Sequence, residues 1–425
     1  MLPDSRFSCQ HCGLCCQVFP RIPVDSERAE TILRNLPAIG ELLSDTLPPT
    51  PLSTINEENS SCATLARRAS GECVFLTRDK KCAIHMMLGE SAKPQVCRDF
   101  PYIFRRTPAG IFVGLSYSCP SVRAGMGTLL SEQLPQLRRH AHEAYRCDTI
   151  RDAIGFDGAY AIRWAAYEMI EGALFDLLAQ TAFALPHRLS AAHVLFGMFR
   201  LWAEARVPRV PGSIEQLLIA DEEVRAFIGV LRRSEFREPL RIASKPRPNA
   251  AARRTFLGLL LACAASMWKS GKPLQASWIL VANYVASALG IGRMQVPPLP
   301  SALPRNILNA KIDGLPPEAD EMLERYVNMC IFRKDLALEK QGLRRGLELL
   351  TLRVALVPVY AHASIITHGT EPLQAFSEAL GTVENYFGHH SQLFAVVDQI
   401  PRLASVFDSF FSQKNFADMI MGRDK

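Results

Sequence analysis

The chain has 425 residues, of which 48% are hydrophobic and 21% are charged, so we expect an ordinary globular core and exclude wholesale disorder. The formal net charge of +6 is small for this length. It is far from the dense basic stripe typical of nucleic-acid-binding proteins, so no nucleic-acid partner is predicted.

The N-terminal segment, residues 1–8, is short and polar and leads directly into cysteines. It has no charged stretch followed by an apolar stretch, which a secretory signal would show. We therefore predict a cytoplasmic protein. Because the cytoplasm keeps thiols reduced, the twelve cysteines indicate metal ligation rather than a disulfide framework.

Eight of these cysteines lie before residue 120 in recognisable spacing, and they are the predicted metal ligands. A C-x2-C spacing lets two sulfurs approach one ion from a tight turn, whose backbone amides can donate hydrogen bonds to thiolate sulfur. Gly13 relieves this turn sterically. The predicted ligands are Cys9, Cys12, Cys15, Cys16, Cys73, Cys82, Cys97 and Cys119.

The segments between these cysteines suggest short elements. Asp25 or Ser26 is expected to cap a helix that continues through Leu33. Residues 37–61 are rich in Pro, Ser and Thr and are expected to form a loop. Residues 73–76 are expected to form a short strand, and residues 102–106 and 111–117 a β-hairpin around residues 107–110.

After about residue 125 apolar residues recur at helical spacing. Helices are expected at 318–332, at 336–360 with a bend or end at Pro358, and at 372–387. The predicted fold class is therefore α+β: a small cysteine-rich metal-binding α/β domain at residues 1–125, then a mostly α-helical domain at residues 126–425. Any division of the latter into two subdomains is expected near 237–254, a basic Pro-containing linker, or near 296–316.

The two longest apolar runs, residues 256–268 and 278–291, are predicted to be buried helices. The first is too short to span a bilayer, and Asn283 and Ser287 interrupt the second. No membrane partner is expected.

The identity of the metal follows less directly from the residues. Eight cysteines could make two four-coordinate zinc sites. Three cysteines at C-x2-C-x2-C with a remote Cys followed by Pro, here Cys119-Pro120, match the ligand arrangement of bacterial ferredoxin loops. We favour an iron–sulfur cluster over zinc. Radical S-adenosylmethionine enzymes are expected to carry a C-x3-C-x2-C spacing. Cys12 and Cys16 have the first gap, but Phe19 stands where the third cysteine would be, so we set radical chemistry aside.

Charge agrees with a site that is rich in thiolates. Residues 62–123 contain ten Lys or Arg against four acids, and nearby cations stabilise an anionic cluster. Arg98 is interpreted as such a partner, or as a phosphate or carboxylate binder, with a salt bridge to Asp99 as the alternative.

Other residues receive more ordinary interpretations. Cys263 and Cys330 are expected in the core, Cys62 and Cys147 are expected to be structural, and His85 and His11 are expected to be polar residues rather than ligands. Gly125-Met-Gly127 and Gly290-Ile-Gly292 are expected to be turns or helix caps, and no G-x-G-x-x-G loop is present. Tyr326 and Glu384 are noted as residues that could line a cofactor pocket.

A set of short motifs resembles the YkgJ-type cysteine-cluster family, whose domain is described as zinc- or iron-chelating. The resemblance covers roughly residues 7–123. It is carried by Phe7-Ser-Cys-Gln-His-Cys-Gly-Leu-Cys-Cys16, Gly71-Glu-Cys-Val-Phe-Leu76, Cys82-Ala-Ile-His85, Lys93-Pro94 and Cys97-Arg-Asp-Phe-Pro101. The long helical extension, with Leu323-Glu-Arg-Tyr326 and Ile331-Phe-Arg-Lys334, is similar to that of flagellin lysine-N-methylase-like proteins.

Three hypotheses result from the sequence. The leading one is a metal-binding cysteine-cluster protein of unassigned activity. The second, implied by the resemblance, is an enzyme: a protein lysine N-methyltransferase that uses S-adenosylmethionine on a protein substrate such as flagellin. The third is a metal-handling or protein-interaction module.

Overall fold

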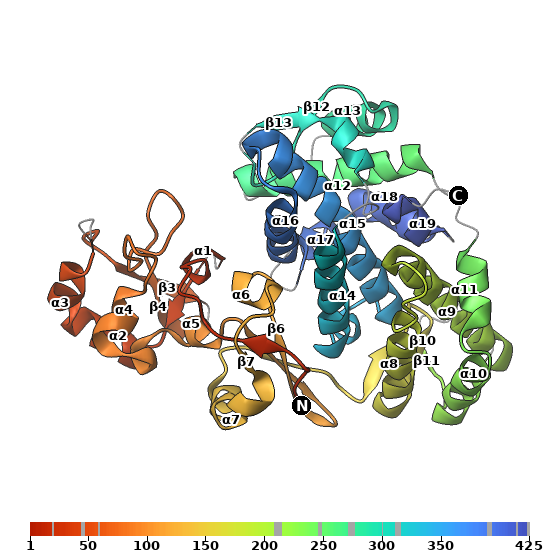
Figure 1. Cartoon of the computed structure of the whole chain (residues 1–425), viewed down its shortest axis with the longest axis horizontal. Coiled ribbons are helices and arrows are strands. Elements are labelled where there is room, and N and C mark those ends of the chain that lie inside the picture. The colour runs from red at the N-terminus through yellow and green to blue at the C-terminus, as the bar shows by residue number, and fades with distance from the viewer. Residues whose placement is uncertain are drawn as a thin grey trace. The chain divides into compact units, whose positions relative to one another are not determined.

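The computed structural model of the chain describes residues 1–18, 21–43, 47–57, 60–207, 215–244, 249–270, 277–299, 301–310, 316–388, 393–413 and 415–422 (Figure 1). The chain divides into two compact units, Met1–Thr149 and Ile150–Lys425. The first combines small sheets with short helices, and the second is mostly helical. The predicted α+β class is confirmed. The division follows Thr149, whereas the sequence suggested a boundary near residue 125.

The first unit contains three small sheets. One has the order β2-β4-β3 and is antiparallel throughout, and a second has the order β6-β5-β8, in which β5 and β8 are parallel. A third pairs the two-residue strands β1 and β7. The strands are β1 (Arg6–Phe7), β2 (Pro23–Val24), β3 (Leu52–Glu57), β4 (Ser60–Leu65), β5 (Tyr102–Thr107), β6 (Gly110–Leu115), β7 (Thr128–Leu129) and β8 (Cys147–Thr149).

Short helices connect these strands. They are α1 (Cys15–Val18), α2 (Ser26–Arg34), α3 (Leu36–Glu41), α4 (Ala83–Leu88), η1 (Glu90–Ala92), α5 (Gln95–Asp99), α6 (Pro120–Arg123), η2 (Leu130–Gln133) and α7 (Leu134–Glu143). Asp25 caps α2 as predicted, because its carboxylate accepts a 3.0 Å hydrogen bond from the amide of Arg28. The predicted hairpin is confirmed as β5 and β6.

Two local predictions in this unit were wrong. Residues 37–61 contain most of α3 and the strand β3, and β4 begins at Ser60, so this segment is not a plain loop. Residues 73–76 form a turn rather than a strand: Cys73 and Leu76 make only isolated bridges, to Arg67 and Cys82, and the amide of Leu76 donates to the carbonyl of Cys73. A β-rich composition favoured a strand, but without a ladder partner the segment turns.

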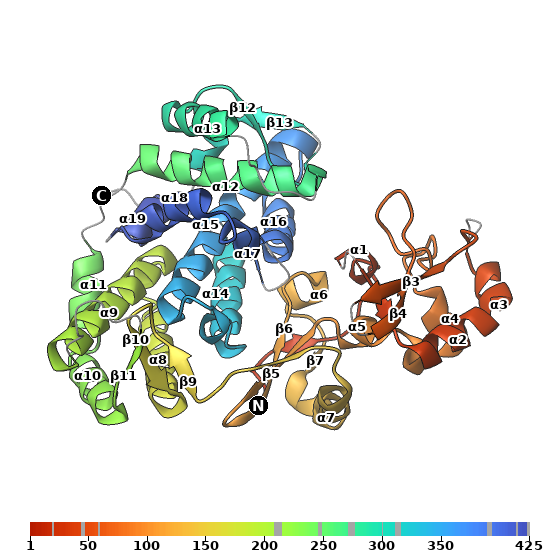
Figure 2. The same cartoon turned by 180° about the vertical axis from the view of Figure 1, so that it is seen from behind.

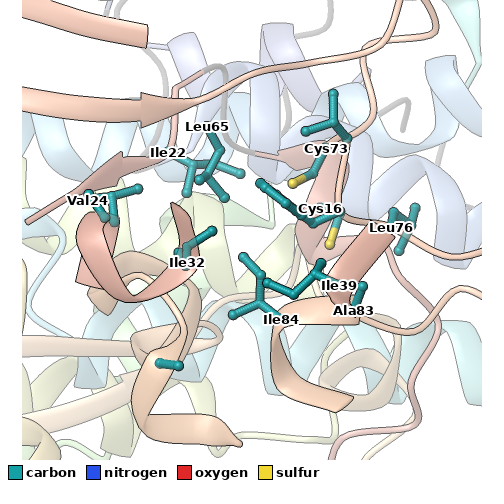
Figure 3. Packing of buried hydrophobic residues seen from close by; sticks show 14 residues of the cluster. Cys16, Ile22, Val24, Ile32, Ile39, Leu65, Cys73, Leu76, Ala83 and Ile84 are labelled. Atoms are coloured by element: carbon teal, nitrogen blue, oxygen red, sulfur yellow. The ribbon is translucent and has the colours of Figure 1, made fainter. Parts of the chain in front are cut away.

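Buried apolar side chains gather between α2, α4, β2 and β4 (Figure 3). Ile22, Val24, Ile32 and Ile84 are among its apolar members, and each is almost completely buried. Cys16 and Cys73 lie within the same cluster, next to Leu76 and Ala83 (Figure 3). The apolar core of the first unit is therefore continuous with two of the predicted metal ligands.

The second unit consists mainly of helices, with a few short strands. The helices are α8 (Trp164–Leu178), α9 (Leu185–Arg206), α10 (Asp221–Arg233), α11 (Arg237–Ala243), α12 (Ala250–Ser270), α13 (Ser277–Leu289), η3 (Arg305–Asn309), α14 (Pro317–Phe332), η4 (Leu336–Leu338), α15 (Leu343–His368), α16 (Pro372–Phe387), α17 (Leu393–Val397), α18 (Pro401–Phe411) and α19 (Phe416–Met421). The strands are β9 (Ala153–Gly155), β10 (Tyr160–Arg163), β11 (Leu217–Leu218), β12 (Arg293–Gln295) and β13 (Ala302–Pro304).

Helix α15 is the core helix of this unit and packs against α9, α14, α16 and α19 (Figure 2). The predicted helices at 318–332 and 372–387 are confirmed as α14 and α16. The third prediction was partly wrong, because α15 starts at Leu343 and continues through Pro358 to His368. Dense packing on all sides compensates for the hydrogen bond that the proline removes.

Two further predictions for this unit were wrong. Residues 237–254 are not simply a linker, since α11 and the start of α12 occupy most of them. The apolar run at 256–268 is largely buried in α12, as expected, with Trp268 exposed at its end, but α13 is not a buried helix. It packs on α12 along one side, and Val281, Tyr284 and Leu289 are exposed. Hydropathy alone does not reveal how much of an apolar helix its neighbours cover.

Two of the described helices, α12 up to Trp268 and α15, are long and apolar enough to cross a membrane by length and composition. Most of each is buried inside the second unit, as in the core helices of many globular proteins.

Candidate metal centre

A cavity of about 700 Å³ lies in the first unit, and seven of the eight predicted ligands line it. They come from four separate segments of the chain. The seven are Cys9, Cys12, Cys15, Cys16, Cys82, Cys97 and Cys119. The eighth, Cys73, does not line the cavity.

The loop that carries the first four cysteines is shaped by its glycine. Gly13 has a φ of +71°, and a Cβ there would lie 3.0 Å from the Cβ of Lys80 and 3.1 Å from the carbonyl oxygen of Lys80. Glycine thus lets the loop lie close to the segment that precedes Cys82. The amide of His11 donates to the sulfur of Cys9 at 3.5 Å, so a backbone amide of this turn does serve a thiol, as the sequence suggested.

The start of this loop is fixed by the pairing of β1 with β7. Phe7 pairs with Thr128, and the Ser8 hydroxyl oxygen accepts a 3.2 Å hydrogen bond from the Thr128 amide. Gly127 has a φ of +109°, and a Cβ there would lie 2.3 Å from the amide nitrogen of Ser8. This position therefore requires glycine. Gly125 caps α6 as predicted, with its amide donating to the carbonyl of Val122.

Cys82 and Cys119 occupy equivalent positions, each as the N-cap of a short helix. The first amides of a helix have no partner within the helix, so they can stabilise a nearby thiolate sulfur. Burial raises the pKa of Cys82, and the nearby amides of His85 and Ile84 oppose this shift. Burial likewise raises the pKa of Cys119, and the amides of Val122 and Ser121 oppose it.

Cys97 lies on α5 and is partly buried. Burial first, then the neighbouring Cys82, raises its pKa to about 12, whereas the cation of Lys93 opposes this shift. Lys93 also lowers the pKa of Cys15 and Cys82, so a single lysine faces three cysteines. Lys93 is one of the ten basic residues counted in this segment, and it faces the predicted ligands.

Cys15 and Cys16 begin α1, and their thiols are hydrogen-bonded to each other. That hydrogen bond, burial and the Cys16 charge raise the pKa of Cys15 well above its ordinary value. The pKa of Cys16 is also raised: its bond to Cys15 lowers it, but a bond to Cys73 and burial outweigh this effect. Cys73 lies near Cys16 in the apolar cluster (Figure 3) and does not line the cavity.

The electrostatic couplings suggest two groups of thiols. Neighbouring thiols act on the pKa of Cys15, Cys16 and Cys97, and these neighbours are Cys15, Cys16, Cys73 and Cys82. Cys119 is coupled to Cys12, and Tyr102 is coupled to Cys119 and Cys9, which indicates an outer group of Cys9, Cys12 and Cys119. Burying so many thiols together disfavours thiolates unless a cation compensates for them. A metal supplies that charge, since a coordinating thiol is deprotonated outright.

The donor set therefore fits a metal centre by its chemistry. Within the part of the chain that the structure describes, no three His, Cys, Asp or Glu side chains converge closely enough to hold one ion. The thiols surround a space that is larger than a single ion.

Comparison with known proteins supports this interpretation. Residues 8–120 match the family model CxxCxxCC, described as a putative zinc- or iron-chelating domain. The match supports a metal-binding cysteine cluster in this part of the chain. No curated protein and no solved structure matches the chain.

The remaining residues considered from sequence have varied positions. His11 and His85 both line the cavity. Cys263 and Cys330 are completely buried in the second unit, as predicted. Cys147 lies in β8 and Cys62 in β4, and the Cys62 side chain is outside the described part of the chain.

Arg98 lines the cavity but pairs with Glu143 at 3.0 Å rather than with Asp99. Sequence reasoning missed three other lining residues, Tyr102, Gln133 and His140. The sequence did contain a signal that His140 is buried. Leu137, His140 and Ala141 recur at helical spacing, and they form the buried side of α7.

Tyr326 and Glu384 belong to a buried ionic network in the second unit. The Tyr326 hydroxyl donates to Glu384 at 2.9 Å, and Arg333 pairs with Glu384 at 2.7 Å and with Asp335 at 2.7 Å. Arg353 lies near both acids. These groups bind one another, and this arrangement accounts for their burial without a cofactor.

Proposed function

We propose that this protein is an iron–sulfur protein whose cluster is held by cysteines of the cavity in the first unit. The observation that carries the proposal is that seven predicted ligands from four chain segments line one cavity of about 700 Å³. The match to a zinc- or iron-chelating domain over residues 8–120 supports a metal in the same place.

The spacing of the thiols favours a cluster over a zinc ion. Zinc–sulfur bonds of ~2.3 Å in a tetrahedron require sulfurs within ~3.8 Å of one another. Among the described residues no group of three His, Cys, Asp or Glu could hold one ion. An iron–sulfur cluster places several atoms between its ligands, so thiols from four segments around one cavity suit it better. Cys119 precedes Pro120, and burial and the charge of Cys12 raise its pKa. Cys119 therefore corresponds to the remote cysteine that completes a ferredoxin-type site.

A cluster would also stabilise the unit that holds it. The cysteine loop, residues 8–14, has no regular secondary structure, and the helices that carry the other ligands have six residues or fewer. Ligation by distant segments ties such a loop-rich region together, so metal binding contributes to folding.

The decisive experiment is the measurement of iron, acid-labile sulfide and the visible spectrum on anaerobically purified protein. We expect a brown protein with about equal iron and sulfide. Cys82→Ser and Cys119→Ser should lose most of both, whereas Cys263→Ser, which changes a buried thiol of the second unit, should retain them. A colourless protein that contains zinc would contradict the cluster, and a metal-free protein would contradict the metal centre altogether.

A further inference from the structure

Helices α5 and α7 form a polar wall of the cysteine cavity. Arg98 on α5 and His140 on α7 both line it. The two helices pack together and are joined by side chains: the Asp99 carboxylate accepts a 2.7 Å hydrogen bond from the amide of Tyr145, just after α7. Arg98 adds its ion pair with Glu143. The wall is thus held by the fold and does not depend on a ligand.

Two polar atoms of this wall are buried without a partner among the described residues. His140 is only 4% exposed, and its Nδ1 has no hydrogen bond. The Nε of Arg98 is also buried without one, although its Nη1 donates to Gln95 and Glu143. Unsatisfied buried polar groups are costly in folded proteins, so two neighbouring ones beside one cavity call for an explanation.

The cavity has room for more than a metal. A coordination sphere of ~2.3 Å radius encloses roughly 50 Å³. A cavity of about 700 Å³ is in the range of small-molecule sites, which measure about 300–1,000 Å³.

The charge of the lining indicates the class of molecule. Lys93 and Arg98 line the cavity together with Lys80 and Lys81, and Glu90 is the acidic residue among the lining residues. Arg98 is paired with Glu143, and the carboxylates of Asp99 and Glu143 also lie near His140. Lys80 is paired with Glu72 at 2.8 Å. A guanidinium N–H and an imidazole N–H in the lining of one cavity are suited to the oxygens of an anion.

We propose that Arg98 and His140 bind the carboxylate or phosphate group of a small molecule inside the cysteine cavity. The placement of this molecule beside a metal rests on the proposed function, but the binding itself rests on the wall alone. The Nε of Arg98 and the Nδ1 of His140 are shielded by their neighbours, so a small rotation of each side chain accompanies binding. Such rotamer changes are common at binding surfaces.

The test is calorimetric titration of the full-length, as-purified protein with inorganic phosphate and, separately, with acetate. We expect at least one of these anions to bind at millimolar concentration. His140→Gln and Arg98→Met should each weaken binding at least ~10-fold, because each loses a hydrogen bond to a charged group. Arg98→Lys, which keeps the charge but has no Nε–H, should weaken it as well. The anion that binds distinguishes a carboxylate ligand from a phosphate ligand.

Matched controls are available in the same unit. His142 is exposed on α7 and Arg106 is exposed on β5, and neither lines the cavity. His142→Gln and Arg106→Met should bind like the unaltered protein. Equal binding by all variants, or no binding of either anion by the unaltered protein, would overturn the proposal.

Metal content, measured on every sample, separates this result from the proposed function. Anion binding without metal would leave the subsite in place and refute the cluster. Metal without anion binding would refute the anion subsite and leave the metal centre in place.

Discussion

The amide of Cys73 donates a 3.1 Å hydrogen bond to the carbonyl oxygen of Cys16, and the two thiols are hydrogen-bonded as well. Cys16 lines the cavity and Cys73 does not. Cys73 is therefore placed to influence the thiol of Cys16 from the apolar cluster, although the spacing of the cysteines predicted both residues as ligands. Hydrogen bonds to ligand sulfurs are among the factors that set cluster potentials.

For Cys73→Ala we expect near-normal iron content and a reduction potential lower by about 40 mV, the equivalent of one hydrogen bond of ~1 kcal/mol. The bond stabilises the more negative, reduced cluster, so its loss favours the oxidised one. Electrochemistry with iron analysis measures both quantities. Cys73→Ser keeps a donor and should keep the potential. Iron loss as severe as in Cys16→Ala would instead show that Cys73 is a ligand.

Gly127→Ala should disrupt the start of the cysteine loop. The new Cβ would lie 2.3 Å from the amide nitrogen of Ser8, at a φ of +109° that other residues rarely adopt. We expect the free energy of unfolding to fall by more than about 2 kcal/mol, together with reduced iron content. Gly125→Ala is the matched control: its φ is +63° but its surroundings are open, so only backbone strain of about 1 kcal/mol should result. Equal losses in both would show that contact with Ser8 is unimportant.

That the cysteines bind metal stays a prediction, but seven of the eight that their spacing singled out do line one cavity. The spacing did not reveal that Cys73 does not line the cavity, or that α7 brings His140 to the same space, because both depend on packing between distant segments.

The same distinction applies to the helical unit. The bounds of α16 were predicted correctly, since Pro372 at its first turn is a local signal. The exposure of α13 and the bounds of α15, Leu343 and His368, were not, because they depend on which neighbours cover each helix.

Lys93→Met should lower the reduction potential by roughly 50 mV, because it removes a cation that faces Cys15, Cys82 and Cys97. The difference should shrink in high salt, since Lys93 is only half-buried and its charge is partly screened. Arg78→Met, at an exposed position outside the cavity lining, serves as the control. An unchanged potential in Lys93→Met at low salt would mean that this lysine does not act on the cluster.

Glu384→Gln should destabilise the second unit by about 3 kcal/mol, because it leaves the fully buried Arg333 short of one counter-charge. Chemical denaturation followed by circular dichroism measures this loss. Glu378 lies on the same helix but is exposed, so Glu378→Gln should change the free energy of unfolding by no more than about 0.5 kcal/mol. Similar behaviour of the two variants would show that the network tolerates the loss.

Because of Glu348, the free energy of unfolding of the second unit should fall as pH rises. Burial raises its pKa to about 7 from an ordinary 4.5, even though Arg345 and Arg344 lower it. A carboxyl whose folded pKa is raised holds its proton more tightly in the folded state. Its stabilising contribution is therefore complete below pH 4.5 and is lost as pH rises to about 7.

The loss amounts to about 3 kcal/mol over that window. Glu348→Gln cannot titrate, so its stability should stay flatter between pH 4.5 and 7 than that of the unaltered protein. Denaturation midpoints at several pH values in both proteins give the comparison. Parallel curves would mean that the ion pairs with Arg344 and Arg345 keep Glu348 charged throughout.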